Sequence, residues 1–373
     1  MTRFQILALD GGGIRGAFQL GFLAELEEAL ERPLHDYFDL IAGTSTGAIT
    51  ASALCFGKTA GEMIDFYRDH GQEIFTAGKP YRPSGWVKWL YPIVNSVFRS
   101  RQGVDMGWLF QSKYDPTPLR LALEGGSEGA RMSDLRYSRF ITPTVNLSRG
   151  RAQVFRTPHF EKPPVDLAGP PNVHDPEVVD VLMASTAAPT YFPHATIGGE
   201  AFADGGLWAI NPSVLAIAEA MKIRQQWLGK LDMGPDSPDY FDTANMHLLS
   251  IGTGNISYSL TPPDESAGAL FWASHSADVM SVSQVQGVGA PLKFLLGERV
   301  HQVNFEVPNP SWTLDDASHI EDQIRLGRIE ARGRMDRLVA MFAGHTASDY
   351  RAELDARAAG EPPGPRQSTL IDG

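Results

Sequence analysis

The chain has 373 residues, 43% of them hydrophobic, so it can bury a large core, and we expect a single α/β domain rather than two smaller ones. Its 32 basic and 44 acidic residues give a net charge of −12, which excludes a general nucleic-acid-binding protein because phosphate contacts require a basic face. One cysteine, Cys55, excludes an internal disulfide, and the first apolar run is too short for a signal peptide, so a cytoplasmic location is expected.

The first predicted element is a buried strand at residues 4–9, FQILAL, which leads into the glycine-rich loop DGGGIRG at residues 10–16. Three glycines of this loop have the spacing GxGxxG, which is typical of dinucleotide binding when it occurs in a strand-to-helix turn. Residues 17–31 carry apolar side chains at helical spacing with acids on the other face, and therefore predict an amphipathic helix. This alternation indicates a parallel α/β fold.

A second strand at residues 37–43 and a helix of small residues at 46–56 enclose the sequence GTSTG. This matches GxSxG, the nucleophile elbow, with Ser45 as the central serine and Gly43 and Gly47 on either side. Neighbours without a Cβ let strand and helix pack closely while the serine Oγ stays exposed, and the helix N-terminus favours negative charge there. An ordinary buried turn with a capping serine is the alternative, but the setting favours catalysis.

The glycine loop therefore has a second interpretation. Acyl transfer needs backbone N–H groups directed at an oxyanion, and consecutive glycines can supply them. The dinucleotide interpretation requires an acidic residue at the end of the second strand, whereas Asp36 and Asp39 precede or open that strand. Because GTSTG ends the strand instead, we favour an oxyanion hole facing the elbow.

The stretch 75–103 is basic and aromatic in an otherwise acidic chain, and we assign it to an insertion at residues 75–130. Its cations, with no acid among them, are Lys79, Arg82, Lys88, Arg99 and Arg101. Trp and Tyr favour a membrane interface and Lys and Arg favour anionic head groups, so the stretch is a candidate membrane contact or lid. A packed helix with solvated basic flanks is the alternative.

Further alternating elements follow in the rest of the chain. Strands are predicted at 139–147, 246–252 and 299–306, and helices at 176–187, 212–228, 268–285 and 318–341. We assign residues 1–340 to the main domain and 341–373 to a polar extension. The part of that extension beyond residue 358, rich in Pro and Gly, is expected to be disordered.

A nucleophilic serine needs a base, and none of the ten histidines lies in an obvious catalytic context. His247 falls within an apolar strand, while His275 and His319 fall on predicted helices. We interpret each as structural or surface-exposed. A triad esterase or acyltransferase that uses a histidine such as His247 remains an alternative.

Asp204 is the better candidate for the base. It ends an apolar stretch and precedes Gly205 and Gly206, which let the backbone approach closely without side-chain obstruction. Taken alone, this pattern would be interpreted as a simple Asp-Gly turn. It acquires meaning only together with the other two loops.

The three loops DGGGIRG, GTSTG and DGG, in this order, resemble those of the patatin-like phospholipases, serine hydrolases that use a Ser–Asp dyad. The resemblance covers about residues 4 to 335. It extends to ASTAAPTYFP at 184–193, Asn211-Pro212, LLSIGTG at 248–254 and TLDDAS at 313–318. One departure is Ile210, where relatives often carry a second asparagine.

This resemblance implies a patatin-like, three-layer α/β/α fold with a mainly parallel central sheet. It makes Ser45 the nucleophile and Asp204 the base and later the general acid. A free aspartate, with a pKa of about 3.9, is a poor base, so the dyad works only if burial raises that pKa. The resemblance further assigns the oxyanion hole to Gly11, Gly12, Gly13 and the supporting Arg15, and motif-supporting roles to Gly16, Gly43, Gly47, Gly205 and Gly206.

The implied activity is cleavage of phospholipid acyl esters, of the phospholipase A or lysophospholipase type, at the inner leaflet of the membrane. Some bacterial relatives are effectors activated by a cyclic dinucleotide, which suggests such an activator, a role in antiviral defence and self-association as hypotheses. We predict no cofactor. We also predict no metal, because the spacing of Asp232, Asp236, Asp239 and Asp242 does not fit a calcium loop. A dinucleotide-binding protein is the alternative from a different class.

Overall fold

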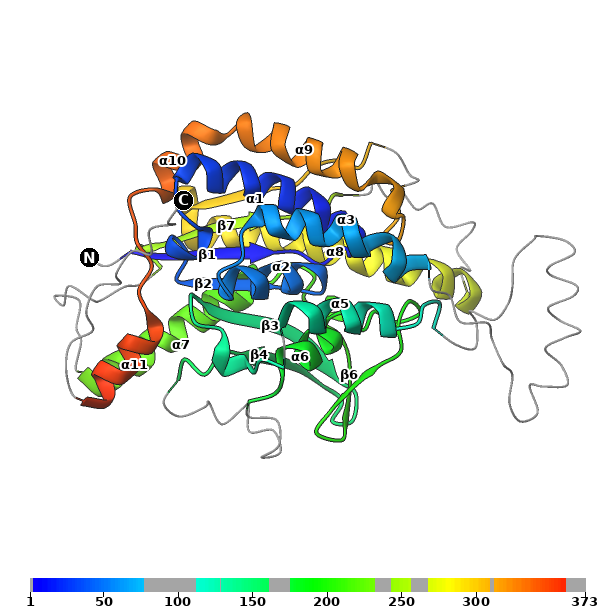
Figure 1. The fold of residues 1–373 in the computed structure, drawn as a ribbon, viewed down its shortest axis with the longest axis horizontal. Coiled ribbons are helices and arrows are strands. Elements are labelled where there is room, and N and C mark those ends of the chain that lie inside the picture. The colour runs from blue at the N-terminus through cyan, green and yellow to red at the C-terminus, as the bar shows by residue number, and fades with distance from the viewer. Residues whose placement is uncertain are drawn as a thin grey trace, which may run out of the picture.

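The computed structural model describes residues 3–76, 112–127, 129–160, 175–231, 243–255, 268–308 and 312–359. Its strands form one eight-stranded sheet in the order β5-β6-β3-β2-β1-β7-β8, with β4 paired to β3 (Figure 1). The strands are β1 (Phe4–Leu9), β2 (Leu40–Gly43), β3 (Arg139–Asn146), β4 (Arg151–Arg156), β5 (Ala195–Ile197), β6 (Glu200–Asp204), β7 (Met246–Ile251) and β8 (Val300–Val303).

The middle of the sheet is parallel, as predicted. Strands β3, β2, β1, β7 and β8 run in one direction, and β4, β5 and β6 pair antiparallel at one side. In the register, Leu9 of β1 lies opposite both Gly43 of β2 and Ile251 of β7. The carboxyl ends of the three central strands therefore meet at one edge of the sheet, where ligands bind in open α/β folds.

Helices cover both faces of the sheet, which confirms the three-layer architecture (Figure 1). Alternate strand residues face opposite sides: Leu7 and Ile41 join a cluster with α1, α2, α3, α6, α9 and α10, and Ile6 and Leu40 join one with α7 and α8. The helices are α1 (Gly16–Leu30), α2 (Thr46–Cys55), α3 (Ala60–Thr76), α5 (Thr117–Ser127), α6 (Val178–Ser185), α7 (Ser213–Leu231), α8 (Ala269–Leu296), α9 (Ile320–Arg332), α10 (Met335–Phe342) and α11 (Tyr350–Ala359).

The predicted elements are confirmed where their periodicity is strong, with two differences among the helices. The helix expected at 268–285 continues to Leu296, through a Gly- and Pro-containing stretch, because Leu292 and Leu296 are buried against the sheet. The helix expected at 318–341 is divided into α9 and α10 at Gly333 and Arg334. Helices α3, α5 and α11 and strands β4, β5 and β6 were not predicted.

Residues after 340 contact the amino end of the sheet. Phe342 joins the main core cluster, and Ala347 donates its N–H to the carbonyl of Asp36 at 2.7 Å. Residues 77–103 of the basic, aromatic stretch, the tail from residue 360, and the aspartates between 232 and 242 lie outside the described residues. Within the described ranges, no helix has the length and apolar character needed to span a membrane.

Candidate active site

Ser45 lies at the sharp turn between β2 and α2, as the elbow motif predicts. Its backbone has φ 53° and ψ −120°, a region that residues other than glycine rarely adopt and that is often found at functional sites. The turn is tight on both sides: a Cβ added to Gly43 would lie 2.2 Å from the carbonyl oxygen of Gly47, and one added to Gly47 would lie 2.3 Å from that of Leu9. Only glycine fits at these two positions.

Asp204 ends β6 and reaches the same place. Its carboxylate accepts a hydrogen bond, at 2.6 Å, from the N–H of Gly206, and it lies near the Ser45 hydroxyl, which acts to lower its pKa. Only 5% of the residue is exposed, and this burial raises the pKa of Asp204 to about 6. Gly205 lies against the carbonyl of Pro143 in β3, so β6 and the following turn approach the sheet closely. The fold thus brings together two residues that are 159 positions apart in the sequence.

The glycine loop faces the elbow, and its three central amides differ. A Cβ on Gly11 would lie 3.3 Å from the Cβ of Ser45, so the two loops are in contact. The N–H of Gly11 donates to the carbonyl of Ile210 at 3.0 Å and is therefore already engaged. Within the described part of the chain, the amides of Gly12 and Gly13 donate to no acceptor, and both residues are partly exposed. These two are the amides available to a ligand.

Two segments that the sequence analysis singled out hold the loop in place. Thr253, in the stretch 248–254, donates its hydroxyl to the carbonyl of Gly11 at 2.8 Å and packs against Gly12. Gly13 has φ +57° and lies so close to the carbonyl of Leu314 that a Cβ there would be 2.1 Å from the oxygen. The loop is thus fixed from two sides, which leaves its exposed amides oriented in advance.

Arg15 is almost fully buried beside this loop. Burial lowers the pKa of its guanidinium to about 10, and its Nε and Nη1 have no hydrogen-bond partner among the described residues. Among the residues that the structure describes, no carboxylate forms an ion pair with it. Gly16 follows at the start of α1, against Thr46 and Tyr67, and lets α1 approach α2. The loop therefore carries a desolvated positive charge.

Asp10 and Asn211 form a buried polar contact beneath the loop, to which the sequence analysis assigned no role. Burial raises the pKa of Asp10 well above its usual value, and a hydrogen bond from Asn211 acts in the opposite direction. Asn211 also donates to the Ser250 hydroxyl at 2.9 Å. Gln19 donates to the carbonyls of Asp10 and Ile251 and so joins β1 to β7. Asp10 and Asn211 lie inside recognised motifs, which was the only signal for them.

The histidine alternative does not fit this geometry. His247 is the second residue of β7, about 13 Å along the strand from the edge where Ser45 lies, and its Nδ1 is 3.1 Å from Arg3 Nη2. Burial, together with nearby arginines, lowers the pKa of His247 to about 4. His275 hydrogen-bonds a carbonyl of its own helix, and His319 faces carboxylates of its own segment. The position of His247 therefore does not support a triad that uses it.

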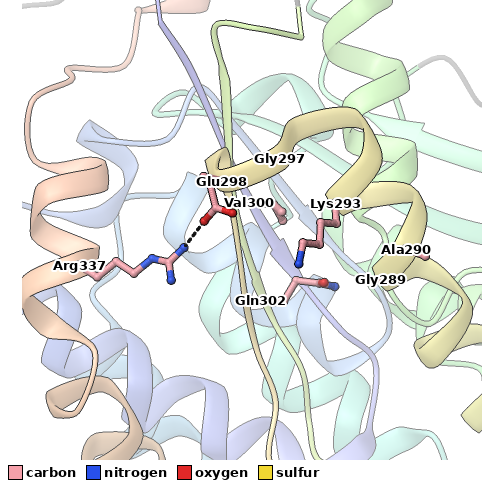
Figure 2. A pocket seen from close by; sticks show the side chains of 8 residues that line it. All are labelled: Gly289, Ala290, Lys293, Gly297, Glu298, Val300, Gln302 and Arg337. Atoms are coloured by element: carbon pink, nitrogen blue, oxygen red, sulfur yellow. Dashed lines mark hydrogen bonds and ion pairs between the residues drawn. The ribbon is translucent and has the colours of Figure 1, made fainter.

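A cavity of about 440 Å³ opens elsewhere, at the outer edge of β8 between α8 and α10 (Figure 2). It contains none of the candidate catalytic residues. The residues that line it are Gly289, Ala290, Lys293, Gly297, Glu298, Val300, Gln302 and Arg337. Over the described ranges, no three His, Cys, Asp or Glu side chains are grouped to hold a metal ion.

Comparisons with known proteins agree with the family resemblance that the order of the three loops indicated. The family model for patatin-like phospholipase matches residues 7–217, a range that includes Ser45, Asp204 and the glycine loop. A cGAMP-activated phospholipase of Vibrio cholerae is 37% identical over 70% of this chain and 67% of its own length. Proteins of the same name from Pseudomonas aeruginosa and Escherichia coli are 31% and 36% identical over 81% and 70% of this chain, and it spans 78% and 65% of their lengths.

Proposed function

The chain belongs to the patatin-like phospholipase family, and from this premise we propose that it hydrolyses phospholipid acyl esters through a dyad of Ser45 and Asp204. One observation carries the proposal. The hydroxyl of a serine in a strained elbow lies near a buried carboxylate, beside two amides that have no partner in the described chain. Acyl transfer needs these three elements in one place.

In the first half of the reaction, Ser45 Oγ attacks the ester carbonyl carbon while Asp204 takes the hydroxyl proton. The carbonyl oxygen becomes an oxyanion, and the tetrahedral intermediate then expels the lysophospholipid alkoxide, which receives the proton from Asp204. An acyl group remains on Ser45. Because the pKa of Asp204 is about 6, roughly nine-tenths of the carboxyl groups are ionised at pH 7 and can accept the proton.

In the second half, a water molecule attacks the acyl-serine carbonyl and gives its proton to Asp204. The second tetrahedral intermediate expels Ser45 Oγ, which takes that proton back, and a fatty acid leaves. The carboxyl therefore acts alternately as base and acid, a role that suits a pKa raised towards neutrality.

The oxyanion is assigned to Gly12 and Gly13 rather than to all three glycines, because the Gly11 amide is engaged by Ile210. A donor of this kind contributes about 2.7–4 kcal/mol to transition-state stabilisation. The buried charge of Arg15 adds a favourable potential for the developing anion. Gly11 keeps a structural role, since it lets the loop contact the elbow.

The names of three relatives are the basis for a proposal on how the activity is regulated. These relatives, 31–37% identical, are named as activated by cGAMP, so we propose that a cyclic dinucleotide activates this enzyme. The substrate then lies in a membrane surface that the protein contacts from the cytoplasm. An effector role in antiviral defence and self-association belong to the same proposal.

The test is a lipid-panel assay by mass spectrometry, with and without candidate cyclic dinucleotides. Wild-type protein is expected to release fatty acid and lysophospholipid, with a higher rate in the presence of the activator. Ser45→Ala and Asp204→Ala are each expected to lower the rate by at least about a thousandfold while the circular dichroism stays unchanged.

A matched control comes from the same helix. Ser52 is buried in α2 and donates its hydroxyl to the carbonyl of Ile49 one turn earlier, so Ser52→Ala should keep its activity. If Ser45→Ala still hydrolyses the substrate, Ser45 is not the nucleophile. If the rate of the wild-type protein does not depend on a cyclic dinucleotide, only the proposed regulation is ruled out.

A further inference from the structure

A short segment at the end of α6 contacts the backbone of both proposed catalytic residues. The Ser185 Oγ accepts the N–H of Ser45 at 3.1 Å, and the carbonyl of Ala187 accepts the N–H of Asp204 at 3.0 Å. Both Ser185 and Ala187 are buried. The segment belongs to the stretch 184–193, which marked the family resemblance but has no part in the proposed chemistry. It lies where it can set the position of one catalytic residue relative to the other.

We propose that Ser185 is a positioning residue for Ser45, and that its hydroxyl holds the elbow in the strained conformation in which Ser45 Oγ faces Asp204. This inference rests on the proposed dyad. Ser185 touches neither the substrate nor the reacting atoms in this arrangement. It acts only through the backbone of Ser45.

The strained backbone at Ser45 explains why an acceptor is needed there. A φ of 53° persists only where the surroundings enforce it. The peptide between Thr44 and Ser45 is held at both ends: its carbonyl accepts the N–H of Gly47 at 2.8 Å, and its N–H donates to Ser185 Oγ. Without Ser185 the N–H loses its acceptor, and rotation of this peptide would relieve the strain. That rotation changes φ of Ser45 and moves Oγ away from Asp204.

The Ser185 hydroxyl is itself oriented so that it can accept. Its Oγ lies 2.7 Å from Thr142 Oγ1 and donates to the carbonyl of Pro143 at 3.1 Å, both in β3. Because the hydroxyl proton is directed towards β3, a lone pair remains for the N–H of Ser45. The same Pro143 carbonyl lies against Gly205, the residue after Asp204. Strand β3 therefore contacts both Ser185, which holds Ser45, and Gly205, which follows Asp204.

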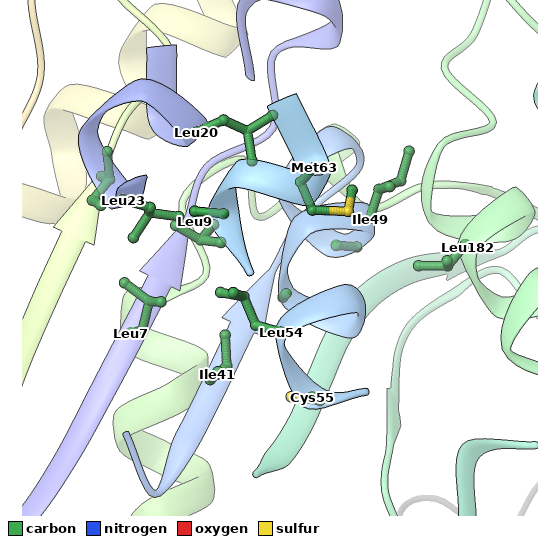
Figure 3. Packing of buried hydrophobic residues seen from close by; sticks show 14 of the residues in the cluster. Leu7, Leu9, Leu20, Leu23, Ile41, Ile49, Leu54, Cys55, Met63 and Leu182 are labelled. Carbon is green, nitrogen blue, oxygen red and sulfur yellow. The ribbon is translucent and has the colours of Figure 1, made fainter. Parts of the chain in front are cut away.

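The surrounding core makes this arrangement rigid. Leu182 of α6 and Ile49 of α2 belong to the same buried cluster (Figure 3), so the helix that carries Ser185 packs beside the helix that follows Ser45. In addition, Thr144 of β3 pairs with Asp204 of β6 in the sheet register. The freedom that remains is the orientation of the Thr44–Ser45 peptide, which the Ser185 hydroxyl controls.

The experiment compares Ser185→Ala, Ser185→Thr and Thr142→Val with wild type. The readouts are kcat and KM on a soluble short-chain ester, the labelling rate of Ser45 by a fluorophosphonate, and the number of sites labelled at completion. Ser185→Ala is expected to lower kcat and the labelling rate per site by about tenfold, since a buried N–H loses its acceptor. KM and the apparent pKa near 6 stay unchanged.

Two matched variants separate positioning from packing. Ser185→Thr keeps a hydroxyl and is expected to recover most of kcat. Thr142→Val removes one of the two β3 contacts of the Ser185 hydroxyl, but the Pro143 carbonyl still accepts its proton and the Ser185–Ser45 hydrogen bond remains, so kcat should stay within about twofold of wild type. If Ser185→Ala does not fold, Ser185→Cys, whose sulfur is a weak acceptor, carries the same expectation.

Failure of this inference differs from failure of the dyad. If a fluorophosphonate does not label Ser45 in wild type, the dyad is wrong and the inference falls with it. If wild type is labelled and Ser185→Ala is labelled at the same rate per site, the dyad stands and the positioning role is overturned. Fewer labelled sites with an unchanged rate per site would show that Ser185 contributes to folding only.

Discussion

The two ends of the central sheet bury carboxylates in different ways. At the amino end, Asp39 accepts from the N–H of Gln5 at 2.7 Å and of Ser348 at 3.0 Å, and its Oδ2 lies 2.7 Å from His345 Nε2. At the carboxyl end, the Asp204 carboxylate has one backbone donor, the N–H of Gly206, and lies near the Ser45 hydroxyl. The first carboxylate joins the C-terminal segment to the sheet. The second is buried with fewer hydrogen-bond donors, and burial raises its pKa.

The buried arginines repeat this contrast. Arg139, at the amino end of β3, is paired with Glu353 of α11, and 2% and 5% of the two side chains are exposed. Arg15, at the carboxyl end, has no such partner in the described chain, and burial lowers its pKa to about 10. The buried pair of Arg139 and Glu353 is compensated and serves stability. Arg15 and Asp204 are desolvated with less compensation, which costs stability and is typical of functional sites.

The largest expected effect on stability tests the amino end. Glu353→Ala leaves Arg139 buried without its partner, so the free energy of unfolding should fall by about 3–5 kcal/mol, measured by denaturant titration. Activity per folded molecule should not change, because the pair lies at the far end of β3 from the site.

An exposed ion pair provides the control for this variant. Glu298 and Arg337 are 3.4 Å apart at the β8 cavity, with 88% and 55% of their side chains exposed (Figure 2). Glu298→Ala is expected to cost less than about 1 kcal/mol. If Glu353→Ala and Glu298→Ala lower the free energy of unfolding by equal amounts, the buried ion pair at the amino end contributes no more to stability than an exposed one.

The next effect tests the carboxyl end through stability. The pKa of Asp204 is about 6 in the folded protein and 3.8 when unperturbed, so the folded state binds more protons between these values and stability falls as the pH rises through that window. Above pH 6 the full cost is about 3 kcal/mol. Asp204→Asn, which cannot ionise, should therefore become more stable than wild type by up to that amount between pH 4 and 7.

Ser45→Ala is the control for this measurement, because the proposed mechanism makes it equally inactive while it keeps the carboxyl. It loses the hydroxyl that lowers the pKa of Asp204, so its stability should also fall as the pH rises, over a window at the same or a higher pH than in wild type. If Asp204→Asn and wild type show parallel curves from pH 4 to 7, the carboxyl is not desolvated as described.

The smallest expected effect is that of pH on the rate of ester hydrolysis. In the proposed mechanism Asp204 must be ionised to accept the serine proton, so kcat/KM should fall about tenfold per pH unit below pH 6 and level off above it. The measurement uses a soluble ester, so that membrane charge does not enter. A midpoint near pH 4 would place the working base in an ordinary solvated environment.

Much of the site follows from local sequence. The GTSTG elbow predicts a strained serine between a strand and a helix, because only glycines at Gly43 and Gly47 permit that approach, and the structure shows the strain at Ser45. The short apolar runs at residues 4–9 and 37–43 predict neighbouring parallel strands, which β1 and β2 form. The choice of Asp204 needed the order of three motifs, since an Asp-Gly pair alone predicts a turn.

The tertiary structure determines which backbone amides and side chains already have hydrogen-bond partners. Nothing in DGGGIRG distinguishes the three glycine amides, yet Ile210, some 200 residues later, takes the first one. The contact of Ser185 with Ser45 spans 140 residues and depends on how α6 packs beside α2. Local sequence determines the conformations a segment can adopt and which side chains it offers. Hydrogen-bond partners and desolvation depend on distant segments packed together, so only the folded chain determines them.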